Sequence, residues 1–244
     1  MTAVGFLYPG HSAEDDYPRM ETLLDSDVRL AVVHTGIGED ADRVDALLEM
    51  GSPARLTAGV EELRLAGAEA VVWACTRGGF AFGPDGARDQ VDLLAQAAGL
   101  PASSTSFAFT HAVRDLGAAR VAVAATYADD VTAHFTGFLE AAGTEVVAAH
   151  GAGIGTAAEA GTWGRDEVLA LARAGDRPDA EAVLLPDTAL HTVAYLTELE
   201  ETLGKPVLTA NQVTVWEGLR LAGRRVRAKG LGTLFARDDR NAPL

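Results

Sequence analysis

The sequence predicts an α/β protein with two similar parallel-sheet halves that face each other across a cleft. Three observations lead to this prediction. Short apolar runs alternate with segments of helical spacing, glycines follow those segments where helix C-caps belong, and the first half of the chain resembles the second. Such alternation is typical of parallel sheets whose strands are connected by helices.

The apolar runs are rich in Val, Ala and Leu, and they have the length of buried strands. Strands are predicted at residues 4–8, 28–34, 70–74, 101–104, 120–125, 145–149, 182–185 and 206–209. Helices are predicted at residues 41–50, 57–66, 85–98, 107–116, 129–142, 165–173, 192–203 and 213–222. The glycines predicted to end helices are Gly67, Gly99, Gly117, Gly143, Gly204 and Gly223.

The internal repeat is clearest around Cys75. Residues 70–76 read AVVWACT and residues 182–188 read AVLLPDT, so each apolar run ends in a reactive residue followed by Thr. The repeat predicts a first half at residues 1–117, a second half at 118–222 and a tail at 223–244 that packs on the first half. Open α/β sheets bind ligands at the carboxyl ends of their strands, so Cys75 and Asp187 are expected to face one shared cleft.

Composition excludes several classes of function. The chain has 244 residues, of which 48% are hydrophobic, and a formal net charge of -15. That charge repels a phosphate backbone, and Lys and Arg form no stripe, so no nucleic-acid partner is expected. No run approaches the ~20 apolar residues of a membrane span, and the N-terminus lacks the pattern of a signal peptide. We therefore expect no membrane association and a cytoplasmic location.

Cys75 is the single cysteine of the chain, which excludes an intrachain disulfide and a thiolate-rich zinc site. For a lone cysteine in a strand, an inert core residue is the ordinary interpretation. Here the thiol precedes Thr76-Arg77-Gly78-Gly79, whose backbone N–H dipoles and guanidinium should lower the thiol pKa. This context favours a reactive thiol.

Asp187 follows the apolar run Val183-Leu-Leu-Pro186. It either caps the next helix or serves as a general base or proton donor in the cleft. Its equivalence to Cys75 in the repeat favours proton transfer. The sequence thus predicts Cys75 and Asp187 as the catalytic pair.

Other side chains near strand ends are candidates for substrate binding. Hydroxyl groups there can donate hydrogen bonds to a substrate carboxylate or to an enediolate, and the loop after the first strand offers backbone N–H groups to an anion. The candidate residues are Pro9, Gly10, Ser12, Thr76, Arg77, Thr126, Tyr127 and Thr188.

Three further patterns are weaker. Gly10-His11-Ser12 resembles a nucleophile elbow, but Glu14 stands where an elbow needs glycine. The glycines within residues 36–38 and 151–155 lack the full spacing of a dinucleotide loop and are interpreted as turns lining the cleft. The six histidines form no closely spaced pair, so no metal site is predicted.

The chain resembles the aspartate/glutamate racemase superfamily, in particular its maleate cis–trans isomerase and arylmalonate decarboxylase branch. The resemblance is nearly end to end and is strongest in the segments Cys75-Thr76, Ala125-Thr126-Tyr127, Gly153-Ile-Gly155, Lys205-Pro206 and Asn211-Gln212. It implies two flavodoxin-like halves related by a pseudo-twofold axis, an active site between them, no cofactor, and a small carboxylate substrate. Dimers are common among similar enzymes, so a homodimer or higher homo-oligomer is an open possibility.

Two positions depart from the pattern that the resemblance implies. Maleate isomerases carry a second cysteine where this chain has Asp187, and an asparagine where it has Ser12. Arylmalonate decarboxylases keep the second cysteine and have glycine at the position of Cys75.

Three reactions fit a cysteine and a carboxylate in one cleft. In an isomerase, the Cys75 thiolate adds to an activated double bond and Asp187 transfers the proton. In an amino-acid or hydantoin-type racemase, the two residues act from opposite faces of an acidic carbon. In a malonate-type decarboxylase, Cys75 protonates the enediolate left by CO2, on the face opposite to that used by decarboxylases with the second-site cysteine. The sequence places isomerase first, racemase or decarboxylase next, and a non-catalytic binder of small anions last.

Overall fold

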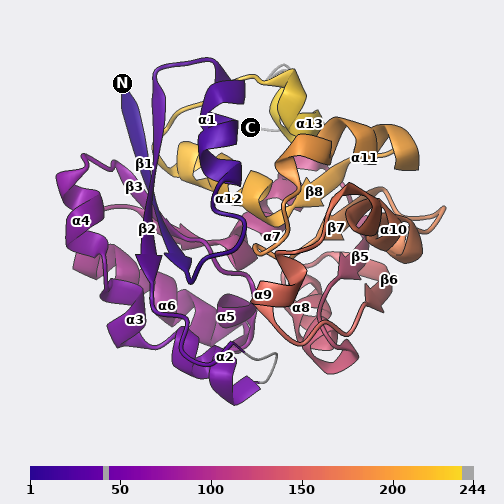
Figure 1. The fold of residues 1–244 in the computed structure, drawn as a ribbon, viewed down its shortest axis with the longest axis horizontal. Coiled ribbons are helices and arrows are strands. Elements are labelled where there is room, and N and C mark those ends of the chain that lie inside the picture. The colour runs from indigo at the N-terminus through magenta and orange to yellow at the C-terminus, as the bar shows by residue number, and fades with distance from the viewer. Residues whose placement is uncertain (41–43, 238–244) are drawn as a thin grey trace.

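The computed structural model describes residues 1–40 and 44–237 and has two four-stranded parallel sheets (Figure 1). The first sheet, in the order β2-β1-β3-β4, contains β1 (Thr2–Pro9), β2 (Val28–Thr35), β3 (Ala70–Trp73) and β4 (Ala102–Ser104). The second, in the order β6-β5-β7-β8, contains β5 (Arg120–Ala125), β6 (Glu145–Gly151), β7 (Ala182–Leu185) and β8 (Val207–Thr209). The two sheets share one strand order, so the predicted α/β fold of two matching halves is confirmed.

All eight predicted strands are present, and the described ends differ by at most two residues from the predicted ones. The strand register places equivalent residues side by side. Val4, Gly5, Phe6 and Leu7 of β1 pair with Ala70, Val71, Val72 and Trp73 of β3, and Val121, Ala122 and Val123 of β5 pair with Ala182, Val183 and Leu184 of β7. The residues after β3 and β7 therefore leave the two sheets at corresponding points.

The helices that correspond to predictions are α2 (Val44–Met50), α4 (Val60–Leu65), α6 (Gly83–Ala98), α7 (Thr105–Leu116), α8 (Asp129–Ala141), α10 (Arg165–Gly175), α11 (Leu196–Leu203) and α12 (Ala210–Leu221). Residues 41–43 of the predicted helix 41–50 lie outside the described residues. All six glycines predicted to end helices have positive φ, which confirms their C-cap role. Within the described residues, no helix combines the length and the apolar character needed to cross a membrane, and the cytoplasmic location stays a prediction.

Several short helices were not predicted. They are α1 (Asp16–Leu24), α3 (Pro53–Thr57), α5 (Arg77–Phe80), α9 (Ala157–Ala160), α13 (Gly232–Ala236) and the 3₁₀ turn η2 (Lys229–Leu231), whereas the 3₁₀ turn η1 (Val193–Tyr195) lies within a predicted helix. The predicted helix 57–66 was wrong at its start, because Gly59 has φ 85° and separates α3 from α4. The predicted helix 192–203 begins as η1 and becomes α11 only at Leu196.

Helices α7 and α12 pack against each other across the boundary between the halves, and α12 extends over the first sheet. α12, from the second half, packs on β1, β3 and β4 and against α1. A Cβ at Gly218 of α12 would lie 2.4 Å from the Val4 side chain, so this glycine allows the close approach. Phe107 and Phe109 of α7 contact Phe138 and Phe135 of α8 edge to face, with ring centroids 5.4 Å apart in both pairs.

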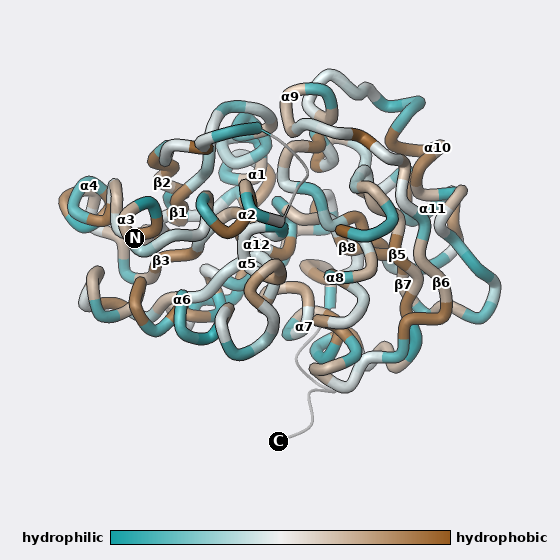
Figure 2. Tube along the Cα trace, turned by 90° about the horizontal axis from the view of Figure 1, so that it is seen from below, coloured by the Kyte–Doolittle hydropathy of each residue, from teal (hydrophilic) through white to brown (hydrophobic). Residues whose placement is uncertain are grey.

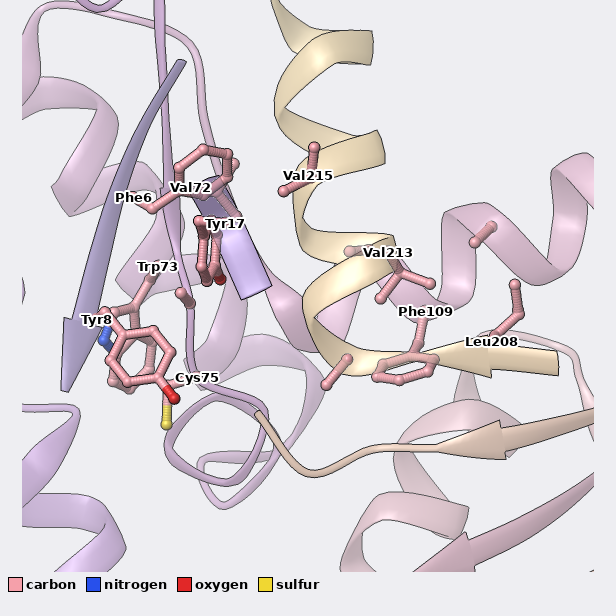
Figure 3. Packing of buried hydrophobic residues seen from close by; sticks show 14 of the residues in the cluster. Phe6, Tyr8, Tyr17, Val72, Trp73, Cys75, Phe109, Leu208, Val213 and Val215 are labelled. Atoms are coloured by element: carbon pink, nitrogen blue, oxygen red, sulfur yellow. The ribbon is translucent and has the colours of Figure 1, made fainter. Parts of the chain in front are cut away.

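Figure 3 shows the resulting core on both sides of α12, with Phe6, Tyr17 and Val72 on one side and Phe109 on the other. In Figure 2, brown apolar segments run along β5 and β7, whereas teal segments include outer turns of helices α4 and α6. The tail contacts both halves: η2 contacts α1, and η2 and α13 contact α11. The division at Gly117 stays a proposal for a domain boundary, since helix contacts across the boundary tie the halves together.

Candidate active site

The Cys75 thiol lies one residue beyond Ala74 at the carboxyl end of β3, and its residue is 3% exposed. The backbone N–H of Ala74 donates to the carbonyl of Leu7, which extends the sheet pairing to the residue before the cysteine. The chain then turns into α5, and the N–H of Gly78 donates to Cys75 Sγ at 3.4 Å. A Cβ at Gly78 would lie 2.3 Å from Trp73 Cη2, so only glycine brings this N–H so close to the sulfur.

The predicted lowering of the thiol pKa is wrong for this structure. Burial, with a smaller contribution from the Asp187 carboxylate, raises the pKa of Cys75 to about 11. The Gly78 N–H and the Arg77 guanidinium do lower it, as predicted from the sequence, but their effect is smaller than the loss of solvent. Cys75 is therefore a protonated thiol near neutral pH.

Met50, at the end of α2, covers the sulfur. The Cys75 thiol contacts Met50 Sδ at 3.5 Å, and Met50 is itself buried. Sequence reasoning missed this residue, because a Met in a helical pattern reads as ordinary core and the contact spans 25 residues.

The Asp187 carboxylate lies at the equivalent end of β7 and is also buried, at 3% exposed. The Thr126 hydroxyl donates to Oδ2, and the Ala189 N–H donates to Oδ1 at 2.9 Å. The bond from Ala189 closes a local turn. Asp187 was considered as a helix cap, but it caps this turn instead, because no helix begins directly after it. Both oxygens are thus held in place, and the substrate-binding role predicted for Thr126 stays a prediction.

Tyr8, at the end of β1, connects three segments near the two catalytic candidates. Its hydroxyl donates to the carbonyl of Thr188 at 2.8 Å and accepts from the N–H of Ala13 at 3.0 Å. Burial raises the pKa of Tyr8, and the Asp187 charge adds to this effect. Because Asp187 influences both Tyr8 and Cys75, the three groups share one electrostatic environment. Tyr8 was not predicted, since an aromatic residue ending an apolar strand gives no signal beyond packing.

Thr76, Arg77 and Tyr127 lie beside the thiol. The hydroxyl Oγ1 of Thr76 is buried and has no hydrogen-bond partner among the described residues. The Arg77 guanidinium lies 5.4 Å from the centroid of the Tyr127 ring, whose hydroxyl donates to the carbonyl of Pro186 at 2.9 Å. A buried donor without a partner costs free energy, so Thr76 is suited to bind an oxygen atom of a substrate.

The loop after β1 forms contacts with the second half. The Ser12 hydroxyl donates to the carbonyls of Ala157 and Ala189, both at 3.2 Å. The backbone N–H groups that sequence reasoning assigned to an anion are already engaged: Gly10 donates to the Thr35 carbonyl, and Ser12 donates to Glu14 Oε2. Pro9 is buried at the strand end and Gly10 has φ 69°, so these two residues shape the loop.

A second buried carboxylate, Asp16, lies where α1 meets the second half. It accepts hydrogen bonds from the N–H groups of Thr192 and Val193 and from Asn211 Nδ2 at 3.2 Å. Burial raises the pKa of Asp16. Asn211 also donates to the carbonyl of Thr188, so one amide connects both networks. Asp16 was missed because α1 was not predicted.

A family model described as arylmalonate decarboxylase matches residues 51–235, which include Cys75, Asp187 and all of the second sheet. The chain belongs to the arylmalonate decarboxylase family. The arylmalonate decarboxylase of Bordetella bronchiseptica is 34% identical over 145 residues, which are 58% of this chain and 60% of that protein. The similarity to this curated relative thus spans less than two thirds of its length.

Solved structures of this family and of maleate isomerases share the fold. A liganded arylmalonate decarboxylase, with one glycine changed to cysteine and one cysteine to serine, is 26% identical, has a TM-score of 0.81 and covers 97% of this chain and 99% of its own. A Nocardia farcinica maleate cis–trans isomerase mutant with a covalently bound succinylcysteine intermediate is 21% identical, with a TM-score of 0.88 and coverage of 97% and 99%. The Pseudomonas putida maleate isomerase with maleate is 19% identical, with a TM-score of 0.86 and coverage of 96% and 98%. The resemblance stated from the sequence is therefore confirmed.

Proposed function

We propose that the chain is a cofactor-independent enzyme that transfers a proton at the α-carbon of a small carboxylic acid, with Cys75 as the proton donor. The reaction best supported is decarboxylation of a malonate-type acid. The observation that carries this proposal is the match of the arylmalonate decarboxylase family model to residues 51–235, together with a buried thiol at the end of β3, whose pKa burial raises to about 11. Membership in the arylmalonate decarboxylase family supports it.

The proposed reaction has two steps. The bond between the α-carbon and one carboxylate breaks, CO2 leaves, and the electron pair stays on the α-carbon as an enediolate with the remaining carboxylate. The Cys75 thiol then gives its proton to that carbon, and solvent returns a proton to the thiolate. A buried, uncharged thiol is suited to this role because it delivers a proton without first having to acquire one.

The neighbouring residues have proposed roles in the same reaction. Thr76 Oγ1, buried and unpartnered among the described residues, donates a hydrogen bond to the carboxylate that becomes the enediolate. Asp187, fixed by Thr126 and Ala189, places a negative charge near the carboxylate that leaves, which favours its loss as neutral CO2. Arg77 and Tyr127 form the wall behind the thiol.

Cis–trans isomerisation of a maleate-like acid, placed first from the sequence, is the second candidate. The observation in its favour is the covalent succinylcysteine of the Nocardia farcinica relative, because a cysteine in that protein binds the C4 unit directly. In this chain the same chemistry requires the thiolate, and burial of Cys75 opposes its formation. Racemisation requires a second acid–base group, and both oxygens of Asp187 already accept hydrogen bonds.

The test is a set of incubations in D2O with aryl malonates, maleate, aspartate, glutamate and hydantoins, each followed by NMR. We expect aryl malonates to lose CO2 and to acquire one deuterium at the α-carbon. Conversion of maleate to its trans isomer without loss of CO2 would contradict the decarboxylase proposal and identify the protein as an isomerase. Deuterium uptake by aspartate, glutamate or a hydantoin would replace it by the racemase.

Two variants test the residue assigned as the proton donor. Cys75→Ala removes the single thiol of the chain and is expected to lose turnover by several orders of magnitude. His134→Asn, at an exposed position on α8, serves as the control and is expected to retain activity. Full activity of Cys75→Ala would refute the proton-donor role. Tight binding of an acid without turnover would favour the non-catalytic binder.

A further inference from the structure

Two histidines and a glutamate form a cluster on the outer side of the loop after β1. His11 and Glu14 lie in that loop, and His34 is the penultimate residue of β2. One ligand atom from each of the three side chains lies within 4.8 Å of the other two. We propose that His11, Glu14 and His34 form a binding site for a divalent metal ion of the zinc class.

The backbone places the three side chains together. Tyr8 of β1 is the register partner of His34 of β2, so the loop that follows Tyr8 starts beside His34. The N–H of Gly10 then donates to the Thr35 carbonyl at 3.0 Å, which holds the loop against the end of β2. The ring centroids of His11 and His34 are 3.9 Å apart. Strand pairing and the loop contact therefore place the backbone of His11 beside His34.

The hydrogen bond of His34 leaves one ring nitrogen for a metal. Its Nδ1 lies 2.7 Å from the carbonyl oxygen of Gly10, and because a carbonyl only accepts, Nδ1 carries the proton. The lone pair is then on Nε2. Histidines that bind metals usually donate their other N–H to a carbonyl or carboxylate in this way, which fixes the ring orientation.

Glu14 and His11 supply the other two ligands. Glu14 Oε2 accepts from the Ser12 N–H at 2.6 Å, and Glu14 Oε1 contacts His11 Nδ1 at 3.0 Å. The backbone thus orients the carboxylate by one oxygen and leaves the other facing the imidazole. Zinc–ligand bonds of about 2.0–2.2 Å require the ligand atoms to lie somewhat closer together than the 4.8 Å within which the three atoms of this cluster lie. The His11 side chain is 73% exposed and free to make that adjustment.

The donor set selects the type of metal. Two imidazoles and one carboxylate suit Zn²⁺, Co²⁺ or Ni²⁺, whereas Mg²⁺ and Ca²⁺ prefer all-oxygen sites. Three protein ligands leave a fourth position for water. The same loop carries Ser12, whose hydroxyl bonds to the second half, so a bound ion would stiffen a wall of the candidate active site. The inference goes beyond the proposed function and does not depend on it.

The test is a titration of the full chain with Co²⁺, followed by its visible d–d absorption, and then displacement by Zn²⁺. We expect one ion per chain and a rise in melting temperature on binding. His34→Asn and Glu14→Gln are each expected to weaken the affinity by at least about tenfold. His134→Asn, at an exposed histidine of α8, and Cys75→Ser are expected to bind as the wild type does.

Three results would overturn the proposal. They are no absorption band with the wild type, unchanged affinity in both His34→Asn and Glu14→Gln, and loss of the band in Cys75→Ser, which would assign the metal to the thiol. Circular dichroism of each variant establishes that it is folded before the titration. Because the readout is metal binding, its failure would leave the proposed decarboxylase reaction untouched.

Discussion

The Cys75 sulfur lies between two unlike neighbours, the Gly78 N–H at 3.4 Å and the Met50 thioether at 3.5 Å. The first stabilises a thiolate and the second does not, because a thioether is a weak acceptor with no N–H or O–H to donate. Combined with burial, this arrangement keeps the proton on sulfur. The thiol is thus prepared to donate a proton to a substrate and protected from reaction with other electrophiles while it is covered.

The first prediction concerns the ionisation of this thiol. Because Cys75 is the single cysteine, ultraviolet absorbance of the thiolate reports this group alone. We expect the absorbance to rise around pH 11 in the folded protein, since burial raises the pKa of Cys75 to about 11. Cys75→Ser provides the baseline that removes tyrosine absorbance. A midpoint below pH 9 would contradict the predicted direction.

The second prediction concerns the charge of Asp187, which raises the pKa of Cys75. Asp187→Asn removes this charge while its amide still reaches Thr126 and Ala189, so the thiol midpoint is expected to move to lower pH. Asp16→Asn is the matched control, a buried carboxylate that does not figure among the influences on Cys75. An equal or absent shift in the two variants would show that Asp187 is not electrostatically coupled to the thiol.

At the scale of single residues, the sequence predicted which groups lie beside the Cys75 thiol but not which influence on its pKa is the largest. The Gly78 N–H and the Arg77 guanidinium were expected beside the thiol, and both influence its pKa in the expected direction. No local sequence pattern indicated how deeply Cys75 is buried, because Met50, which contacts the sulfur, is 25 residues away in the sequence. Tyr8 and Asp16 were missed for the same reason, since their partners lie far away in the sequence.

Among the elements, α12 is the one that most directly connects the halves. Gly218 allows its backbone to approach Val4, Phe6 and Val72 of the first sheet. A glycine in the middle of a helix is normally unfavourable, so its presence here indicates a packing requirement. The sequence predicted this helix but not the sheet that it covers. Helical spacing indicates that a helix has an apolar face, but it does not indicate which element packs against that face.

The third prediction compares two helical glycines. Gly218→Ala would place a Cβ 2.4 Å from Val4 Cγ1 and is expected to destabilise the protein by about 1–3 kcal/mol. Gly137→Ala, within α8, meets no atom within 4 Å and is expected to stabilise it by about 0.5–1 kcal/mol. Urea denaturation measures both. Equal effects of the two substitutions would refute the close packing of α12 on the first sheet.

Short elements escaped prediction because their signals were weak or misleading. Pro18 lies within α1 and reads as a helix breaker, although proline is tolerated in the first turn, where its missing N–H has no intrahelical partner. The buried face of α1 consists of only Asp16, Tyr17, Met20 and Leu24, too few positions to establish a helical period. The eight strands were easier, since each is a continuous apolar run between turn signals.

In the whole molecule, helix contacts across the boundary make each half depend on the other. α12 packs on α1 and on the first sheet, and α7 packs on α8 through pairs of Phe rings. A stretch containing only residues 1–117 would therefore leave Val4, Phe6 and Val72 without their cover. The repeat predicted two similar halves, but this mutual cover could be recognised only in three dimensions.

The fourth prediction follows for residues 1–117 produced alone. At low concentration we expect no cooperative unfolding transition, because the uncovered sheet cannot repay the entropy of ordering the chain. The full chain, in which α12 supplies the cover, is expected to unfold in one transition observed equally by Trp fluorescence and circular dichroism. A cooperative transition from a monomeric fragment would contradict this prediction, and measurement of mass by light scattering identifies the species.

The crossing of α7 and α12 also bears on how a chain of this kind can originate. Here α12, the last helix of the second half, covers the first sheet, and two identical copies of a half-length polypeptide could lend their last helices to each other in the same way. The symmetric pair so formed would have the layout seen here, and joining its two copies end to end would create the repeat of AVVWACT and AVLLPDT. In a chain joined in this way, the two strand ends could diverge, one with a thiol and the other with a carboxylate, as at Cys75 and Asp187.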